Sequence, residues 1–159
     1  MVNKKILYAH QGGLHVFKLI GELRFDSGYA FEQALTHYEN ASLADTVIMD
    51  LQEATLIDST ILGLICGLIK SKHDAALVAW VTHANIKKTL KQVGLDHFFA
   101  IVENPHLVKL PVDFEEMSHA DEEQLKVKAR VHQAHQRLME LSDYGHAQFK
   151  SVTDKMSKH

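Results

Sequence analysis

The chain has 159 residues, of which 46% are hydrophobic, so it is long enough for one compact domain with an appendage and too short for two full domains. Seventeen Lys and Arg residues against twenty Asp and Glu residues give a formal net charge of −3, and neither sign forms a long block. Nothing in this balance indicates a surface that binds nucleic acid or an anionic membrane, and we expect neither partner.

The cysteine content and the N-terminus indicate the cellular compartment in which the protein is expected. Cys66 is the only cysteine, which excludes a disulfide within the chain, and its apolar neighbours predict a buried thiol in a reducing environment. The first apolar run stops at Ala9, too short for a signal peptide, and no segment is long enough to cross a bilayer. We therefore expect a cytoplasmic protein.

The first 51 residues predict a hairpin, a helix and a buried strand. Apolar segments 7–9 and 14–20 flank two adjacent glycines, which favour a tight turn, and Gly21 is expected to end the second strand. Apolar residues then recur at helical spacing behind Ser27, a suitable N-cap. Segment 46–51, TVIMDL, is almost continuously apolar, as in a strand covered on both faces.

Alternating elements continue to about residue 102. We expect a loop at 52–57, a helix at 59–72, a strand at 77–81, a helix from Asn85 to about Gly94 and a last strand at 98–102. Strands that alternate with helices at this short spacing predict an α/β fold, with a mixed β-sheet, parallel neighbours and helices mainly on one face.

The composition changes after the last strand, and we place the domain at residues 1–112 and a helical C-terminal extension at 113–159. Apolar residues follow each other at spacings of four, three, four and three, at Val127, Val131, Ala134, Leu138 and Leu141. The register slips near Gly145, so we expect a helix that is broken or bent there. The apolar seam has to bury against its own domain, which we favour, a second copy in a homodimer, or a partner.

The stretch LIDSTILGLI, residues 56–65, is the candidate site. Asp58, Ser59 and Thr60 precede an apolar helix beyond the end of an expected parallel strand, where open sheets place their sites. In most proteins such residues only cap the helix. A helix start also favours negative charge, by about 0.3–1 kcal/mol, so a phosphate on either hydroxyl is compatible with the fold.

Small residues recur along one face of the same helix, at Thr60, Gly63, Gly67 and Ser71. Each interior glycine costs about 1 kcal/mol relative to alanine, so we expect a compensating close approach by another backbone. The neighbour on this face is then either the sheet of the domain or another protein.

Other chemistries find little support in the sequence. His132 and His135 lie one helical turn apart, but their spacing matches no metal-site signature, and we expect solvated histidines and no metal. No phosphate-binding loop, nucleophile elbow or Cys-His pair is recognisable. We expect neither catalysis nor a cofactor.

The order of these elements resembles the STAS domain, the fold of bacterial anti-sigma factor antagonists, over about residues 4–110. The most specific match is Asp58-Ser59-Thr60 followed by Leu62-Gly63, which is similar to the family signature D-S-[ST]-G-L-G. Gly94-Leu95 also stands where the family has a Gly-Leu pair before its last strand. Ile61 departs from the signature, because it replaces the first glycine.

This resemblance implies an anti-sigma factor antagonist in a partner-switching pathway. The unphosphorylated antagonist would bind an anti-sigma factor that is also a serine kinase of the GHKL type. Phosphorylation of Ser59, with Thr60 as the alternate acceptor, would release it, and a serine phosphatase would restore it. The implied partner-binding residues are Asp58, Ser59, Thr60, Gly63 and Gly67. The final output would be transcription, biofilm formation or another process.

STAS domains also serve transporters, which leaves a second hypothesis. The chain would then be a STAS accessory subunit of an ABC-type lipid transport system. The same helix start at Asp58 would dock an ATPase.

Overall fold

The computed structural model describes residues 3–41, 46–71, 75–105, 112–119 and 123–148. Its strands are β1 (Lys5–Gln11), β2 (Leu14–Leu23), β3 (Thr46–Leu51), β4 (Ala54–Ile57), β5 (Ala76–Val81), β6 (Ala100–Glu103) and β7 (Glu115–Glu116). They form a mixed sheet in the order β6-β5-β3-β2-β1-β7, and β4 pairs with the end of β2. The neighbours from β6 to β2 are parallel, whereas β1 is antiparallel to both β2 and β7.

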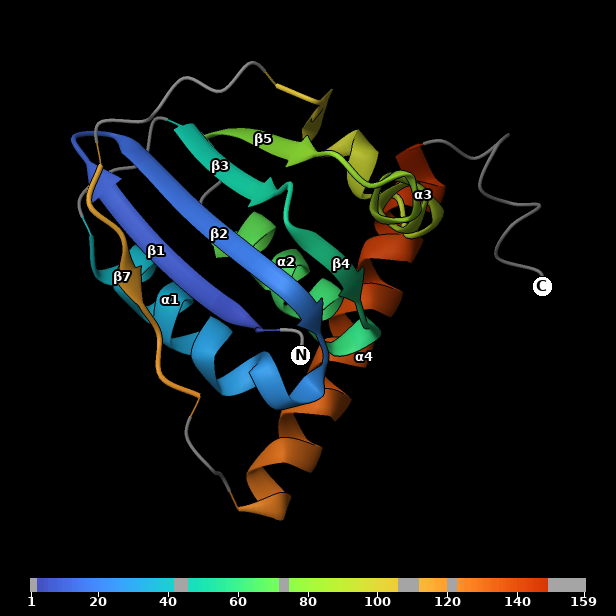
Figure 1. Ribbon diagram of the computed structural model, residues 1–159. Coiled ribbons are helices and arrows are strands. Elements are labelled where there is room, and N and C mark those ends of the chain that lie inside the picture. The colour runs from blue at the N-terminus through green and yellow to red at the C-terminus, as the bar shows by residue number, and fades with distance from the viewer. Residues whose placement is uncertain (1–2, 42–45, 72–74, 106–111, 120–122, 149–159) are drawn as a thin grey trace.

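The helices are α1 (Gly28–Asn40), α2 (Ser59–Ser71), α3 (Ala84–Gln92) and α4 (Gln124–Gln148), with short 3-10 turns η1 (Phe25–Ser27) and η2 (Leu95–His97). Figure 1 shows α1 and α2 on one face of the sheet and α4, in orange to red, running alongside α2. The helix α3 packs against β4 and β5. The predicted α/β fold with a mixed sheet is therefore confirmed.

The core lies between the sheet and this helical layer. Alternate residues of β2, among them Phe17 and Leu19, point toward α1 and α2 and are fully buried. On the helix side, Phe31 of α1 and Ile65 of α2 are buried in the same apolar cluster. The apolar residues that recur at every second position of the strands therefore pack against those that recur about every 3.6 positions in the helices.

The second strand does not end at Gly21, as expected from the sequence, but continues to Leu23. Gly21 has a φ of 90°, and the register shifts between Gly21 and Glu22. A Cβ atom at Gly21 would lie 2.7 Å from the carbonyl oxygen of Asn3. The glycine thus bends the strand and lets the neighbouring chain approach.

The segment expected as a loop before α2 contains β4, which pairs in parallel with the last residues of β2. Ala54 and Ile57 of this strand are buried and Thr55 is exposed. Four residues are too few for their apolar pattern to stand out from a loop. The strand helps to position the site, because the first turn of α2 follows it almost directly in the chain.

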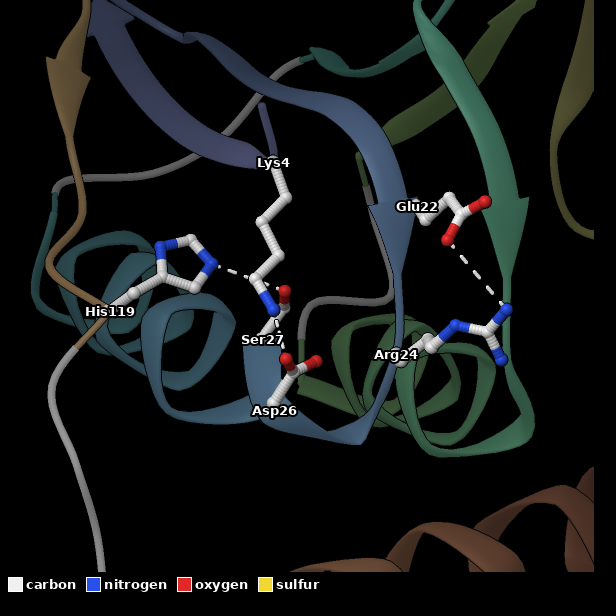
Figure 2. Close-up of polar contacts among 6 residues, drawn as sticks. All are labelled: Lys4, Glu22, Arg24, Asp26, Ser27 and His119. Carbon is white, nitrogen blue, oxygen red and sulfur yellow. Dashed lines mark hydrogen bonds and ion pairs between the residues drawn. The ribbon is translucent and has the colours of Figure 1, made fainter. Parts of the chain in front are cut away.

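The expected last strand is followed by one more, β7, which pairs with β1 at the edge of the sheet. Its two glutamates are exposed and carry no apolar pattern, so its pairing depends on backbone hydrogen bonds. Just after it, the His119 ring nitrogen Nε2 lies 3.1 Å from the Ser27 hydroxyl (Figure 2). These contacts tie the segment that precedes α4 to the sheet and to the start of α1.

In the described part of the C-terminal extension, the helix is not broken at Gly145, contrary to expectation. The helix α4 continues through Gly145 to Gln148, because one interior glycine costs only about 1 kcal/mol and does not by itself end a helix. The apolar positions expected at 149, 152 and 156 lie outside the described residues. Residues 112–119, at the start of the extension, are not helical.

Candidate functional site

Asp58 occupies the N-cap of α2. Its carboxylate oxygen Oδ1 accepts a hydrogen bond from the backbone N–H of Ile61 at 3.1 Å. Its own N–H donates to the carbonyl oxygen of Leu23 at 3.0 Å, which fixes the cap to the end of β2. The helix start is therefore held by β2 on one side and by a carboxylate cap on the other.

The two hydroxyls after Asp58 lie in different surroundings. Ser59 is exposed, and its Oγ atom lies 2.8 Å from the Nε2 atom of His135 on α4, a hydrogen bond between residues 76 positions apart. The Thr60 side chain is only 2% exposed. In this conformation, then, only the Ser59 hydroxyl is open to a second molecule.

The small-residue face of α2 meets α4. A Cβ atom at Gly63 would lie 2.5 Å from the Cα atom of Ala134, and Ala134 is fully buried. One turn further along, a Cβ atom at Gly67 would lie 3.1 Å from the Nη1 atom of Arg137. Close backbone approach is confirmed at Gly63, whereas Gly67 meets a side chain. In both cases the neighbour within the chain is its own C-terminal helix and not its sheet.

Polar contacts hold α4 at several points along its length. The Arg130 guanidinium, 6% exposed, donates to the Glu32 carboxylate of α1 at 2.6 Å and lies over Gly28. Toward the other end, Lys70 of α2 pairs with Glu140 of α4. The helix α4 is thus bound to both α1 and α2.

The apolar seam of the extension faces the domain. Ala134 and Leu141 are buried, and Leu138 packs against the hydrophobic core. Met139, between them in sequence, is 67% exposed. The seam therefore packs back on its own domain, as favoured from the sequence.

The remaining sequence candidates have ordinary environments. Cys66 is buried, as expected, and burial raises the pKa of its thiol to about 12, so it is unreactive at neutral pH. Within the described ranges, no three His, Cys, Asp or Glu side chains converge on a metal position. His132 is exposed, and His135 is directed to Ser59.

His135 is the site residue that sequence reasoning missed. Its spacing from His132 drew attention only as a metal pattern, and nothing in the local sequence connects it to Ser59. The contact exists because Ala134 seats α4 on Gly63, which brings the next residue of α4 to the first turn of α2. The small residues at matching places on the two helices, Gly63 and Ala134, were the sequence signal from which this contact could have been predicted.

Comparison with family models assigns the chain to a family. The model of the STAS domain matches residues 5–108, and the chain therefore belongs to the STAS-domain family. Ile61, which replaces a glycine of the signature, is fully buried in the core, so the substitution adds an internal contact. A search of curated proteins gives no match.

The match stops before α4, so the helix that covers α2 lies outside the matched region. In the described part of the chain, no helix combines the length and apolar character needed to span a membrane.

Proposed function

We propose that this STAS-domain protein is an anti-sigma factor antagonist that is switched by phosphorylation of Ser59. The observation that carries the proposal is an exposed hydroxyl at a helix start whose cap is supplied by another residue, Asp58. Ser59 is therefore available for modification without loss of the cap. Because Thr60 is buried, Ser59 is the favoured acceptor.

The physical effect of a phosphate at this position supports a switch in binding. Phosphorylation adds about −1.5 to −2 charges at neutral pH. Two unit charges about 6 Å apart interact by about 3 kcal/mol at an effective dielectric constant near 20. When a partner covers this site, the phosphate and the Asp58 carboxylate lose hydration and their repulsion is less screened, so binding would weaken by about two to three orders of magnitude unless the partner supplies cations.

The same phosphate is compatible with the folded domain. The first N–H groups of a helix have no partners within the helix, and the helix dipole favours negative charge there. The Asp58 cap bonds the N–H of Ile61, and the core beneath is apolar and packed. Modification would therefore change the partner's affinity rather than the fold.

The proposed partners are a GHKL-type anti-sigma factor that is also a serine kinase, and a serine phosphatase. In this role the protein works in the cytoplasm as a binding protein and a kinase substrate, without catalytic activity or a cofactor of its own. The unphosphorylated form holds the kinase and frees the sigma factor or another target.

The test starts with phosphosite mapping of protein isolated from its own cells, where phosphate is expected on Ser59. In pull-downs, Ser59→Ala is expected to retain the kinase and Ser59→Asp to lose it by about 100-fold in affinity. Ser118→Asp, which places the same charge at another exposed serine, serves as the control and is expected to bind like the wild type. Equal retention of Ser59→Ala and Ser59→Asp would exclude the switch.

The same purification tests the transport hypothesis. Recovery of an ABC-type ATPase in place of a kinase, with no phosphate on Ser59, would favour an accessory subunit of a transport system.

A further inference from the structure

The face of α2 that carries the proposed switch is already occupied in this chain. We call it the α2 outer face and define it by Ser59, Thr60, Gly63 and Gly67. His135 hydrogen-bonds the first of these residues, Ala134 packs on Gly63, and Arg137 lies over Gly67. These three residues of α4 follow the face over about two turns of α2.

The closeness of this packing excludes a simultaneous partner. At Gly63 the two helices approach so closely that even one methyl group would collide with the backbone of Ala134. A second protein that contacts Gly63 or Gly67 has to take the volume that α4 fills. Binding of α4 and binding of such a partner are therefore mutually exclusive on this face.

The two polar contacts between α4 and α2 are at the surface and are suited to reversible association. Lys70 and Glu140 are about half exposed, and ion pairs between such side chains contribute little because water competes for both charges. The hydrogen bond between Ser59 and His135 is likewise at the surface. Among the described side chains of α4, only Arg130, Ala134 and Leu141 are buried, so much of the helix faces solvent.

We infer that α4 is an intramolecular inhibitor that competes with the partner kinase for the α2 outer face. The inference rests on the proposed function, because it concerns access to the same site. Release of α4 frees Gly63 and Gly67 for binding and separates His135 from the Ser59 hydroxyl. If α4 covers the face in about 99 of 100 molecules, the apparent affinity for the partner falls about 100-fold.

Two variants of the full chain move α4 in opposite directions. Ala134→Glu puts a charge at the closest point between the helices and releases α4 without changing the α2 outer face. Met139→Glu adds the same charge to α4 at an exposed position and is the matched control. Lys70→Cys with Glu140→Cys, joined by a reducible bismaleimide, locks α4 in place. The buried thiol of Cys66, with its pKa of about 12, does not react.

Binding to the purified kinase that accompanies the native protein is then measured by calorimetry. We expect Ala134→Glu to bind at least about 10-fold tighter than the wild type, and the locked chain at least about 10-fold weaker, with recovery after reduction. Met139→Glu is expected to match the wild type. Amide hydrogen exchange verifies that β3 remains protected in every variant and that α4 loses protection in Ala134→Glu.

The outcomes separate the inhibitor from the switch. A locked chain that binds the kinase as tightly as the wild type overturns inhibition by α4, even if Ala134→Glu fails to fold. If Ser59→Ala and Ser59→Asp still differ in that case, the proposed function stands alone. If those two variants bind equally while the locked chain binds weakly, α4 competes with a partner that does not respond to phosphorylation.

Discussion

Asp58 and Ser59 divide two tasks at the first turn of α2. The carboxylate of Asp58 holds the helix start through the N–H of Ile61, so the hydroxyl of Ser59 is not needed for capping. Ser59 instead points to α4, where its partner is His135. Asp58 thus secures the helix start, and the exposed hydroxyl of Ser59 has no part in capping.

A second histidine, His119, is expected to make the stability of the folded protein depend on pH. His119 contacts Ser27 (Figure 2). Burial is the largest of the effects that lower the pKa of His119 below its usual range. The nearby Lys4 lowers it further, whereas Asp26 and Glu116 act in the opposite direction. The folded state therefore prefers the neutral ring.

Acidification is accordingly expected to destabilise the native state through His119. The neutral His119 ring makes its full contribution to the free energy of unfolding above the usual histidine pKa of about 6.5. This contribution is lost as the pH falls from that value toward the lower pKa of the folded state, because the unfolded chain takes up the proton first. Urea unfolding at about pH 7.5 and about pH 5.5 measures the effect. His119→Gln should lose less stability than the wild type between the two conditions, and an identical loss would contradict this prediction.

At the scale of elements, the pair α2 and α4 depends on two glycines in different ways. Gly63 meets the backbone of Ala134, which cannot move without moving α4. Gly67 meets the far end of the flexible Arg137 side chain, which can adopt another rotamer. The same substitution at the two positions therefore tests how closely the helices pack.

Gly63→Ala is expected to destabilise the seating of α4, because overpacking costs about 1–3 kcal/mol and exceeds the gain of about 1 kcal/mol in helix propensity. Gly67→Ala is expected to be neutral or to stabilise the protein by up to about 1 kcal/mol. Urea unfolding and the amide exchange of α4 provide the measurements. Equal effects of the two substitutions would show that α4 does not rest on Gly63.

The elements that the sequence predicted well are those with a long apolar period. Segment 46–51 was predicted with the bounds of β3, α1 was predicted to begin behind Ser27, as it does, and α2 and α3 were predicted within one or two residues of their described bounds. The strands β4 and β7 were missed, because four and two residues carry too little pattern. Gly21 was misplaced as a strand end, because a glycine inside a strand gives the same local signal as a turn.

At the scale of the whole molecule, the described part of α4 returns to the STAS domain and buries its seam within the same chain. Figure 1 shows this helix beside α2, on the side of the sheet that also carries α1. In the part of α4 whose side chains the structure describes, Ala134 and Leu141 are already buried, so little of that part of the seam remains for a second copy.

We therefore expect the full chain to be a monomer at micromolar concentration, as measured by light scattering coupled to size exclusion. A chain that ends before Gln124 would lack α4, uncover the α2 outer face and show increased self-association or lower solubility. A full chain that forms a stable dimer, together with a shortened chain that remains monomeric, would assign the seam to dimer formation instead.

The sequence alone determined the STAS architecture and indicated the stretch in which we propose the switch. Alternation, helical period and the D-S-T start are local patterns, each readable from a few consecutive residues such as Asp58 to Thr60. Only the tertiary structure decided which hydroxyl is accessible and what packs on Gly63. The packing on Gly63 depends on where a helix from the far end of the chain comes to rest. That position is set by the summed packing of small and apolar residues on two helices, and no local pattern encodes it.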